Sequence, residues 1–214
     1  MPLDAPPSEL TRGDARRRGI LDVARETFLA RGYAATSMSE IAARVGGSKG
    51  TLYNYFRSKE ELFSAVIAET CHGLASTYFD PLPPIGKGRP VRDSLIDLGV
   101  SLMEFLQVPE ILAMHRLVTG EVGRFPEIGP IFYEAGPRVG VLRFTQYFEL
   151  AIAEGRFPAG DAQMLGQRLK DLVMSDLYLR LQWGVLDTIG PAALREHVAQ
   201  SVQIFLAAFA PRLA

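Results

Sequence analysis

Compact polar side chains gather between residues 48 and 59 of this 214-residue chain. Hydroxyl and ammonium groups donate hydrogen bonds to phosphate oxygens, lysine and amide groups also pair with base edges, and glycine lets a backbone approach closely. Leu52 and Phe56, in the same segment, are suited to anchor it in a core. The polar set comprises Ser48, Lys49, Gly50, Thr51, Tyr53, Asn54, Tyr55 and Lys59. Its chemistry fits the major groove of DNA, which is about 12 Å wide.

The elements that would position this set are helices separated by glycine. Apolar residues over 16–31 recur at the spacing of one helix face, and Gly32 predicts the end of that helix. A second helix is expected over 37–45, because its first serine and a glutamate three residues later form a capping-box pattern. A third is expected over 48–56 and a fourth over 58–79. Helix, glycine turn and helix is the layout of a helix-turn-helix reader.

The rest of the chain also has the pattern of helices. Prolines and glycines between residues 81 and 90 predict a linker, and no segment has the alternation of a strand. Further helices are expected over 91–106, 109–122, 127–154, 161–186 and 190–210. We therefore predict an all-α fold in three parts: a flexible N-terminal tail (1–14), a helix-turn-helix DNA-binding domain (15–62) and a ligand-binding and dimerisation domain (63–214).

Composition places the chain among folded, non-membrane proteins. Hydrophobic residues make up 48% and charged residues 22%, which is typical of a globular protein. A single cysteine excludes an internal disulfide, and no secretion signal or membrane-length apolar run is present, so we expect a soluble, cytoplasmic protein without a membrane partner. The net charge divides into +4 over residues 1–59 and −5 over residues 60–214. A small basic head thus precedes an acidic body.

The sequence gives little support for an enzyme. The histidines stand at positions 72, 115 and 197, and the neighbours Cys71 and His72 would point about 100° apart on a helix. No phosphate-binding glycine loop occurs in a strand-to-helix context. We expect no catalytic residue, metal or cofactor. The remaining alternative is a helical ligand-binding or scaffold protein that does not bind DNA.

The segment over residues 41–62 resembles the signature of the TetR family of transcriptional regulators. It reads IAARVGGSKGTLYNYFRSKEEL, and Phe28, Gly32 and Thr36 stand upstream as they do in that family. Two positions depart from the family pattern, since Val45 replaces the usual alanine and Gly47 replaces a small aliphatic residue.

The resemblance implies DNA contacts by three groups of residues. Those approaching phosphates are Thr36, Ser37 and Ser39, those approaching bases are Lys49, Gly50 and Thr51, and those holding the DNA backbone are Tyr53, Tyr55 and Lys59. The cluster Arg16, Arg17 and Arg18 is a further candidate for phosphate or minor-groove contacts. In the alternative interpretation the tyrosines only cover the head, Lys59 is a solvated first-turn residue and the arginines belong to a solvated tail.

Residues 110–157 resemble the AefR-like group of TetR C-terminal domains, which implies a helical body that senses a small molecule. An apolar cavity with a few polar groups between helices would hold that effector. The candidates for its lining are Phe105, His115, Arg116, Phe125, Tyr133, Phe144, Tyr147, Phe148, Tyr178 and Trp183. In the alternative interpretation each aromatic residue belongs to the core or to a dimer contact. His115 and Arg116 would either meet an anionic ligand or pair with a nearby glutamate.

The last two expected helices carry wide apolar faces that predict a homodimer interface built as a four-helix bundle. The face over 161–186 consists of Leu165, Leu169, Leu172, Val173, Tyr178, Leu179 and Leu181, and that over 190–210 of Val198, Val202, Phe205, Leu206 and Phe209. The alternative is that one face only closes the subunit core. Together these inferences predict a dimeric repressor that a small-molecule effector releases from a palindromic operator.

Overall fold

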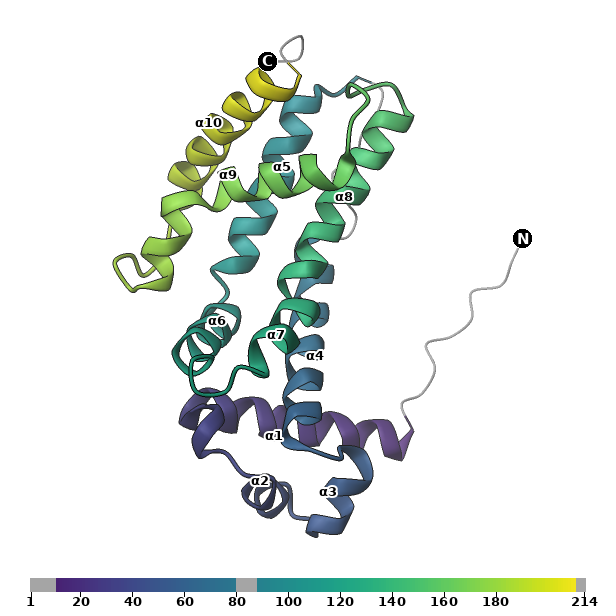
Figure 1. Cartoon of the computed structure of the whole chain (residues 1–214), viewed down its shortest axis with the longest axis vertical. Coiled ribbons are helices and arrows are strands. Elements are labelled where there is room, and N and C mark those ends of the chain that lie inside the picture. The colour runs from purple at the N-terminus through teal and green to yellow at the C-terminus, as the bar shows by residue number, and fades with distance from the viewer. Residues whose placement is uncertain (1–10, 80–87, 211–214) are drawn as a thin grey trace, which may run out of the picture.

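The computed structural model describes residues 11–79 and 88–210, and these residues form helices without a strand (Figure 1). The helices are α1 (Arg12–Ala35), α2 (Met38–Val45), α3 (Lys49–Tyr55), α4 (Lys59–Phe79), α5 (Val91–Leu106), α6 (Pro109–Glu121), α7 (Ile128–Ala135), α8 (Pro137–Ala153), α9 (Ala162–Gln182) and α10 (Pro191–Phe209). The all-α fold expected from the sequence is confirmed. The predicted linker lies largely in residues 80–87, outside the described residues.

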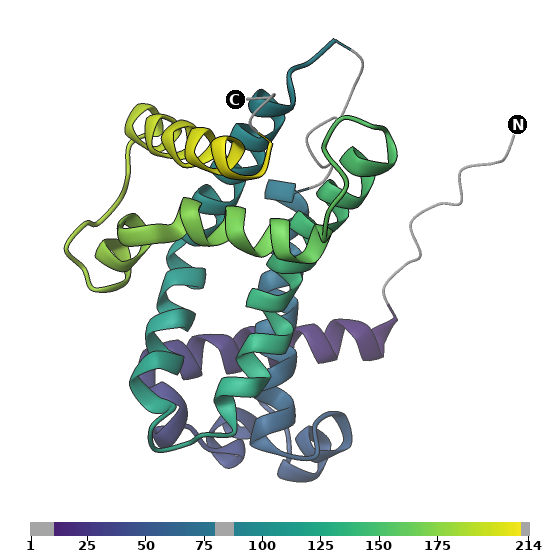
Figure 2. The ribbon, with the colours of Figure 1, turned by 45° about the horizontal axis from the view of Figure 1, so that its top comes forward.

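The first three helices form a small head at one end of the molecule. Figures 1 and 2 both show α1 lying across the lower end of the body, with α2 and α3 beyond it. Leu52 and Phe56, the predicted anchors of the third helix, are buried together with Phe28 and Ile41. Burial of these apolar side chains fixes the orientation of α3 and leaves its other face to solvent.

The body is built around α4, α5, α8, α9 and α10. The helix α4 rises from the head into the body (Figure 1), and α9 packs on α8 while α10 packs on α5 and α9. Gly166 of α9 makes the crossing with α8 close, because a Cβ at this position would lie 2.9 Å from the backbone nitrogen of Thr145. Gly99 of α5 is similar, since its Cβ would lie 2.7 Å from a methyl group of Val198.

The N-terminal boundary differs from the expected one. The first helix begins at Arg12, so residues 11–14 belong to its start and not to a tail. The reason is a capping box, in which the Thr11 hydroxyl accepts the Asp14 N–H and the Asp14 carboxylate accepts the Thr11 N–H. The first part of the expected tail, residues 1–10, lies outside the described residues. Gly32 breaks the helix as predicted, with a φ of 81°.

Two helices of the body also differ from expectation. The helix expected over 127–154 is two helices that meet at Gly136 and Pro137, because proline has no N–H to continue the hydrogen bonding of α7. The helix expected over 161–186 begins with an Asp161 cap and ends at Gln182. Within it the backbone departs from helical geometry at Ser175, whose φ is 27°.

The apolar faces predicted for the dimer interface are largely inside the chain. Of those residues, Leu165, Leu169, Val173, Tyr178, Leu181, Val198, Val202, Phe205 and Leu206 are buried by the other helices of the body. These residues of both helices therefore close the subunit core, whereas the alternative interpretation assigned that role to one face. Leu179 is an exception, at 42% exposed. The described residues contain no helix long and apolar enough to cross a membrane.

Candidate functional site

The exposed face of α3 carries the polar residues that the sequence predicts. Ser48 caps the helix, and its hydroxyl accepts the Thr51 N–H at 3.0 Å. The side chains of Lys49, Tyr53 and Asn54 are exposed, as is Gly50, while Thr51 and Tyr55 are partly exposed. The structure therefore brings these predicted contacts to one surface at the free end of the head (Figure 1).

The residues at the start of α2 divide between surface and interior. Ser37 caps α2 by accepting the Glu40 N–H at 3.2 Å, and both Ser37 and Ser39 are exposed. Glu40 pairs with Arg31 and does not return the bond to the cap, so the predicted capping box is only half formed. Thr36 is 2% exposed, because its hydroxyl donates to the Gly32 carbonyl at the end of α1. Its side chain is thus an internal cap and not a surface phosphate contact.

Lys59 is partly buried between the start of α4 and the end of α1. Its ammonium group donates to the carbonyls of Tyr33 and Thr36, at 3.0 and 3.3 Å. The same nitrogen lies 4.1 Å from the centroid of the Tyr33 ring, a cation–π contact. In this structure the ammonium group is therefore hydrogen-bonded to the carbonyl end of α1, where a positive charge is favoured.

Two of the three clustered arginines lie against the DNA-binding elements. A Cβ at Gly47 would lie 2.8 Å from the guanidinium of Arg16, so the departure from the family pattern at this position leaves room for that side chain. The guanidinium of Arg17 lies 5.3 Å from the centroid of the Phe56 ring. Arg18 is exposed. The cluster therefore adds positive charge beside α3.

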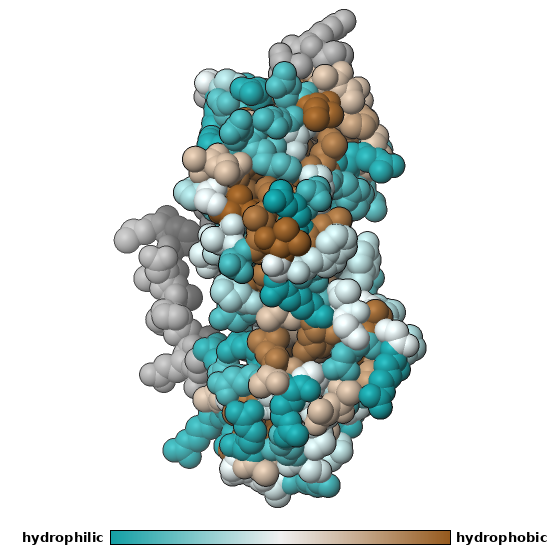
Figure 3. Space-filling model, turned by 90° about the vertical axis from the view of Figure 1, so that its left-hand side faces the viewer, coloured by the Kyte–Doolittle hydropathy of each residue, from teal (hydrophilic) through white to brown (hydrophobic). Residues whose placement is uncertain are grey.

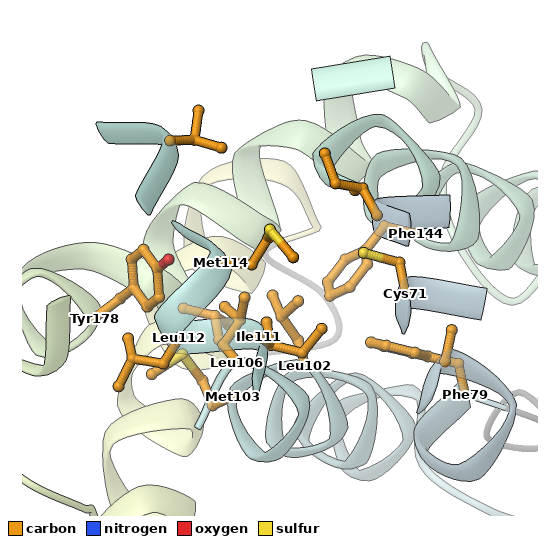
Figure 4. Packing of buried hydrophobic residues seen from close by; sticks show 14 of the residues in the cluster. Cys71, Phe79, Leu102, Met103, Leu106, Ile111, Leu112, Met114, Phe144 and Tyr178 are labelled. Carbon is orange, nitrogen blue, oxygen red and sulfur yellow. The ribbon is translucent and has the colours of Figure 1, made fainter. Parts of the chain in front are cut away.

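A cavity of about 90 Å³ lies inside the body between α4, α5, α6, α7, α8 and α9. It exceeds the roughly 10–15 Å³ that one water molecule needs. Its lining is mostly apolar, and Figure 4 shows Cys71, Phe79, Leu102 and Met114 among the side chains that meet here. The lining consists of Ile67, Thr70, Cys71, Ala75, Phe79, Leu102, Phe105, Leu106, Ile111, Met114, His115, Phe132, Gly136, Pro137, Val139, Gly140, Arg143, Lys170 and Met174.

Of the predicted ligand residues, Phe105 and His115 line this cavity. Tyr178 is not part of the lining, and its hydroxyl is hydrogen-bonded to His115. Phe144, Tyr147 and Phe148 are fully buried in the core, as the alternative interpretation holds. Cys71, Met114 and Met174 also line the cavity but were not predicted to do so. Apolar residues on a helix face have the same sequence pattern whether they fill a core or line a cavity.

The other predicted ligand residues lie away from the cavity. Arg116 donates to the carbonyls of Leu181 and Gln182 at the end of α9, so it neither pairs with a glutamate nor faces the cavity. Phe125 packs edge-on against Tyr33, with ring centroids 5.3 Å apart, at the joint between head and body. Two further candidates are at the surface, Tyr133 at 51% and Trp183 at 70% exposed.

His115 is a polar group of the cavity that contacts two neighbouring rings, those of Phe132 and Tyr178. Its Nδ1 is hydrogen-bonded to the Tyr178 hydroxyl, and that hydroxyl also donates to Oε1 of Gln182 at 3.3 Å. The ring stands perpendicular to that of Phe132, with centroids 4.7 Å apart. Burial lowers the pKa of His115 to about 4. The imidazole is therefore neutral at physiological pH.

The cavity's single thiol is also in its protonated form. Burial raises the pKa of Cys71 to about 11. Over residues 11–79 and 88–210, the His, Cys, Asp and Glu side chains form no group of three that could hold a metal ion.

The head and the body are joined where α6 meets the break in α1. The Glu121 carboxylate, at the end of α6, accepts the backbone N–H of Ala34. Gly32 stands beside it with a φ of 81°, and a Cβ there would lie 2.4 Å from a carboxylate oxygen. The same helix lines the cavity with Ile111, Met114 and His115. One rigid element thus contacts both the cavity and the head.

Comparison with known proteins agrees with this two-part architecture. Residues 20–66 match the model of bacterial regulatory proteins of the tetR family, and residues 93–211 match the AefR-like transcriptional repressor, C-terminal domain. A putative TetR-family regulator from Mesorhizobium loti has a similar structure, with a TM-score of 0.80 and 27% identity over 92% of this chain and 98% of that one.

Two further similar proteins have functional names. The flavonoid-responsive regulator FrrA has a TM-score of 0.79 and 30% identity, covering 91% of this chain and 96% of its own. The transcriptional activator FasR of Mycolicibacterium smegmatis is 48% identical over 63 residues. That match spans 29% of each protein.

The family consists of DNA-binding regulators and not of enzymes, in accordance with the sequence analysis. The chain belongs to the TetR family of helix-turn-helix transcriptional regulators, and its C-terminal domain is of the AefR-like group.

Proposed function

We propose that this regulator is a repressor that binds a palindromic operator as a homodimer and is released by a small, largely apolar effector. The observation that carries the proposal is the position of α6, which lines the cavity through Ile111, Met114 and His115 and reaches α1 through Glu121. An effector that displaces α6 would change the placement of the head. Release then follows from a difference in operator affinity between the two placements.

The proposed DNA contacts follow from exposure and chemistry. Bases are read by Lys49, Gly50, Thr51 and Asn54 on α3, with Ser48 at its start, and phosphates are held by Ser37, Ser39, Tyr53 and Tyr55. Thr36 and Lys59 act indirectly, because their polar groups bond to carbonyls at the end of α1. The matched family is one of bacterial regulatory proteins, so the proposed place of action is the cytoplasm.

A dimer is proposed because one recognition helix makes too few contacts for a specific site. Two-fold related helices about 34–36 Å apart would read two half-sites on one face of DNA. Apolar side chains still exposed near the end of α9 and on α10 are the proposed contact surface. They are Leu179, Trp183, Val185 and Ile204. Figure 3 shows hydrophobic patches on the side of the molecule that carries these helices.

The repressor role and the effector class rest on similarity as well as on the cavity. Residues 93–211 match the C-terminal domain of AefR-like transcriptional repressors. FrrA, which is similar over most of the chain, is named as flavonoid-responsive. An aromatic effector would suit the apolar lining of the cavity here.

The experiment is a binding titration of the full chain with duplexes from its own promoter region. We expect tight, salt-dependent binding to a palindromic segment and loss of that binding in Lys49→Ala combined with Asn54→Ala, since both side chains are exposed on α3. Arg92→Ala combined with Gln146→Ala, exposed on the body, is the matched control and should bind normally. Equal binding by both double variants would contradict the proposed interface. Raised transcription from the promoter in cells when the regulator is added would contradict repression.

A further inference from the structure

The wall of the cavity is rich in rings and sulfur atoms. Phe79, Phe105 and Phe132 come from α4, α5 and α7, and the sulfur-bearing residues are Cys71, Met114 and Met174. Aromatic rings attract the edges and faces of other rings, and a methionine thioether near a ring adds a favourable contact. A wall of this kind favours a flat aromatic body over a flexible aliphatic chain of the same volume.

The polar groups of the wall differ in what they can offer to a ligand. The Thr70 hydroxyl donates to the Val66 carbonyl at 2.8 Å, and the ammonium of Lys170 lies 2.7 Å from an oxygen of Asp171. His115 is engaged through Nδ1, by Tyr178. The nitrogen Nε2, on the other side of the same ring, is therefore the atom of His115 that is left for a ligand.

With the side-chain amide of Gln182 oriented as in this structure, the hydrogen bonds of Tyr178 assign the proton of the neutral His115 ring. A phenolic hydroxyl has a single proton, and that of Tyr178 is directed to the side-chain oxygen Oε1 of Gln182 at 3.3 Å. The Tyr178 oxygen consequently accepts from His115, so Nδ1 holds the proton of the neutral ring. Nε2 then has a lone pair and no proton, and it accepts a hydrogen bond but cannot donate one.

We infer that the cavity binds an aromatic ligand bearing a hydroxyl group, and that this hydroxyl donates its proton to Nε2 of His115. The inference rests on the proposed function, in which this cavity is the effector site, and it adds the chemical class of the effector. The aromatic body lies among Phe79, Phe105 and Phe132, and the phenolic O–H lies at the His115 end. Tyr178 is a positioning residue, since it acts on the ligand through the tautomer of His115.

The matched probes are β-naphthol, its methyl ether and β-naphthoate, titrated by calorimetry into the full-length protein. The ether is the more apolar of the first two, so cavity burial alone would favour it, whereas a hydrogen bond to Nε2 reverses the order. We expect β-naphthol to bind about 10-fold more tightly than the ether, the effect of a buried acceptor that would otherwise lose its partner. Stronger binding of β-naphthoate than of β-naphthol would assign recognition to Arg143 and Lys170 and overturn the inference.

Substitutions test whether His115 causes the preference for β-naphthol over its methyl ether. His115→Phe keeps a ring of similar size and should remove the preference for β-naphthol while leaving ether binding unchanged. Tyr178→Phe removes only the hydroxyl that fixes the tautomer and should reduce the preference in part. His72→Phe, on the exposed side of α4, is the matched control and should keep it. A preference that survives in His115→Phe contradicts the inference.

A measurement without substitution covers the case in which a variant does not fold. Nitrogen NMR of the wild-type protein should find Nε2 of His115 unprotonated, with a resonance that shifts on addition of β-naphthol and not on addition of the ether. A protonated Nε2 or no shift overturns the inference. Operator titration in the same samples separates release by an effector from recognition of its hydroxyl group. Release by β-naphthol and by its ether alike would support the effector site and contradict hydroxyl recognition. Selective binding of β-naphthol without release supports the inference and contradicts release by this ligand.

Discussion

Both carboxylate oxygens of Glu121 lie within hydrogen-bond distance of the backbone N–H of Ala34, at 3.2 and 3.0 Å. This contact spans the joint between the body and the head. It is possible because Gly32, two residues earlier, has no side chain where the carboxylate lies. In the proposed function, a displacement of α6 would act through this contact on the backbone that leads from α1 into α2.

The first prediction concerns this close approach. Gly32→Ala should lower the free energy of unfolding by about 1–3 kcal/mol, because its φ of 81° and ψ of 168° suit only glycine. A part of that loss comes from the Glu121 oxygen, 2.4 Å from the new Cβ. In a Glu121→Ala background the same substitution should therefore cost less. Urea denaturation of the four proteins in the double-mutant cycle measures this, and strictly additive losses would show that Gly32 does not accommodate the carboxylate.

The second prediction concerns Lys59. Lys59→Met should lower the free energy of unfolding by about 1–2 kcal/mol, since the variant loses hydrogen bonds to two carbonyls and the cation–π contact with Tyr33. Thermal denaturation monitored by circular dichroism is the measurement. Arg57→Met, exposed just before α4, is the control and should melt like the wild type. An unchanged melting temperature for Lys59→Met would return this lysine to the role of a phosphate contact.

The third prediction separates base reading from phosphate binding at Lys49. The side chain is exposed at the start of α3, so Lys49→Ala should not change stability. If its ammonium donates to a guanine, the variant loses about 1–3 kcal/mol on the operator and less on a scrambled duplex. Titrations of both duplexes at several salt concentrations are the test. Equal losses on the two sequences would make Lys49 a phosphate contact and leave base reading to Thr51, Asn54 and the backbone near Gly50.

The fourth prediction is a pH dependence of stability that originates at His115. Its pKa is about 4 in the folded protein against an ordinary value of 6.5, so between these values the unfolded chain binds more protons at this residue. Stability therefore falls as the pH is lowered from 6.5 towards 4, by about 3 kcal/mol at most. His115→Phe should flatten the profile in this window. Superimposable wild-type and His115→Phe profiles would show that the imidazole is not desolvated.

The fifth prediction tests the proposed dimer surface. Ile204 is 60% exposed on α10, and Ile204→Glu would place a charge in the proposed interface. We expect a folded monomer by light scattering at micromolar concentration, with weak operator binding. Tyr133→Glu, at a comparably exposed position on α7, should remain a dimer. A dimeric Ile204→Glu protein would move the interface elsewhere.

The sequence predicts the head well because its signals are local. The cap at Ser48, the anchors Leu52 and Phe56 and the glycines after α2 are all within a few residues of the elements they determine. Lys59 shows the limit of this reasoning. Its partners are carbonyls more than twenty residues away, and no pattern within α4 indicates them.

The body is less predictable for a physical reason. Its helices are amphipathic or apolar on several sides, and sequence spacing does not distinguish a face packed within the chain from one that lines a cavity or meets a second chain. Val198 and Phe205 are core residues while Ile204 is exposed, although all three lie on one apolar helix. The body nevertheless has one local signal, the Gly136–Pro137 break, which determines the boundary between α7 and α8. In the head, the Thr11 and Asp14 capping box determines the start of α1 in the same way.

The buried thiol has a consequence for redox chemistry. Peroxides and disulfides react with thiolates, and a cysteine whose pKa is about 11 is almost entirely protonated at neutral pH. Cys71 is the single cysteine of the chain, so no other thiol competes for oxidation or links two subunits covalently. Oxidation of a cysteine is therefore not expected to regulate this protein.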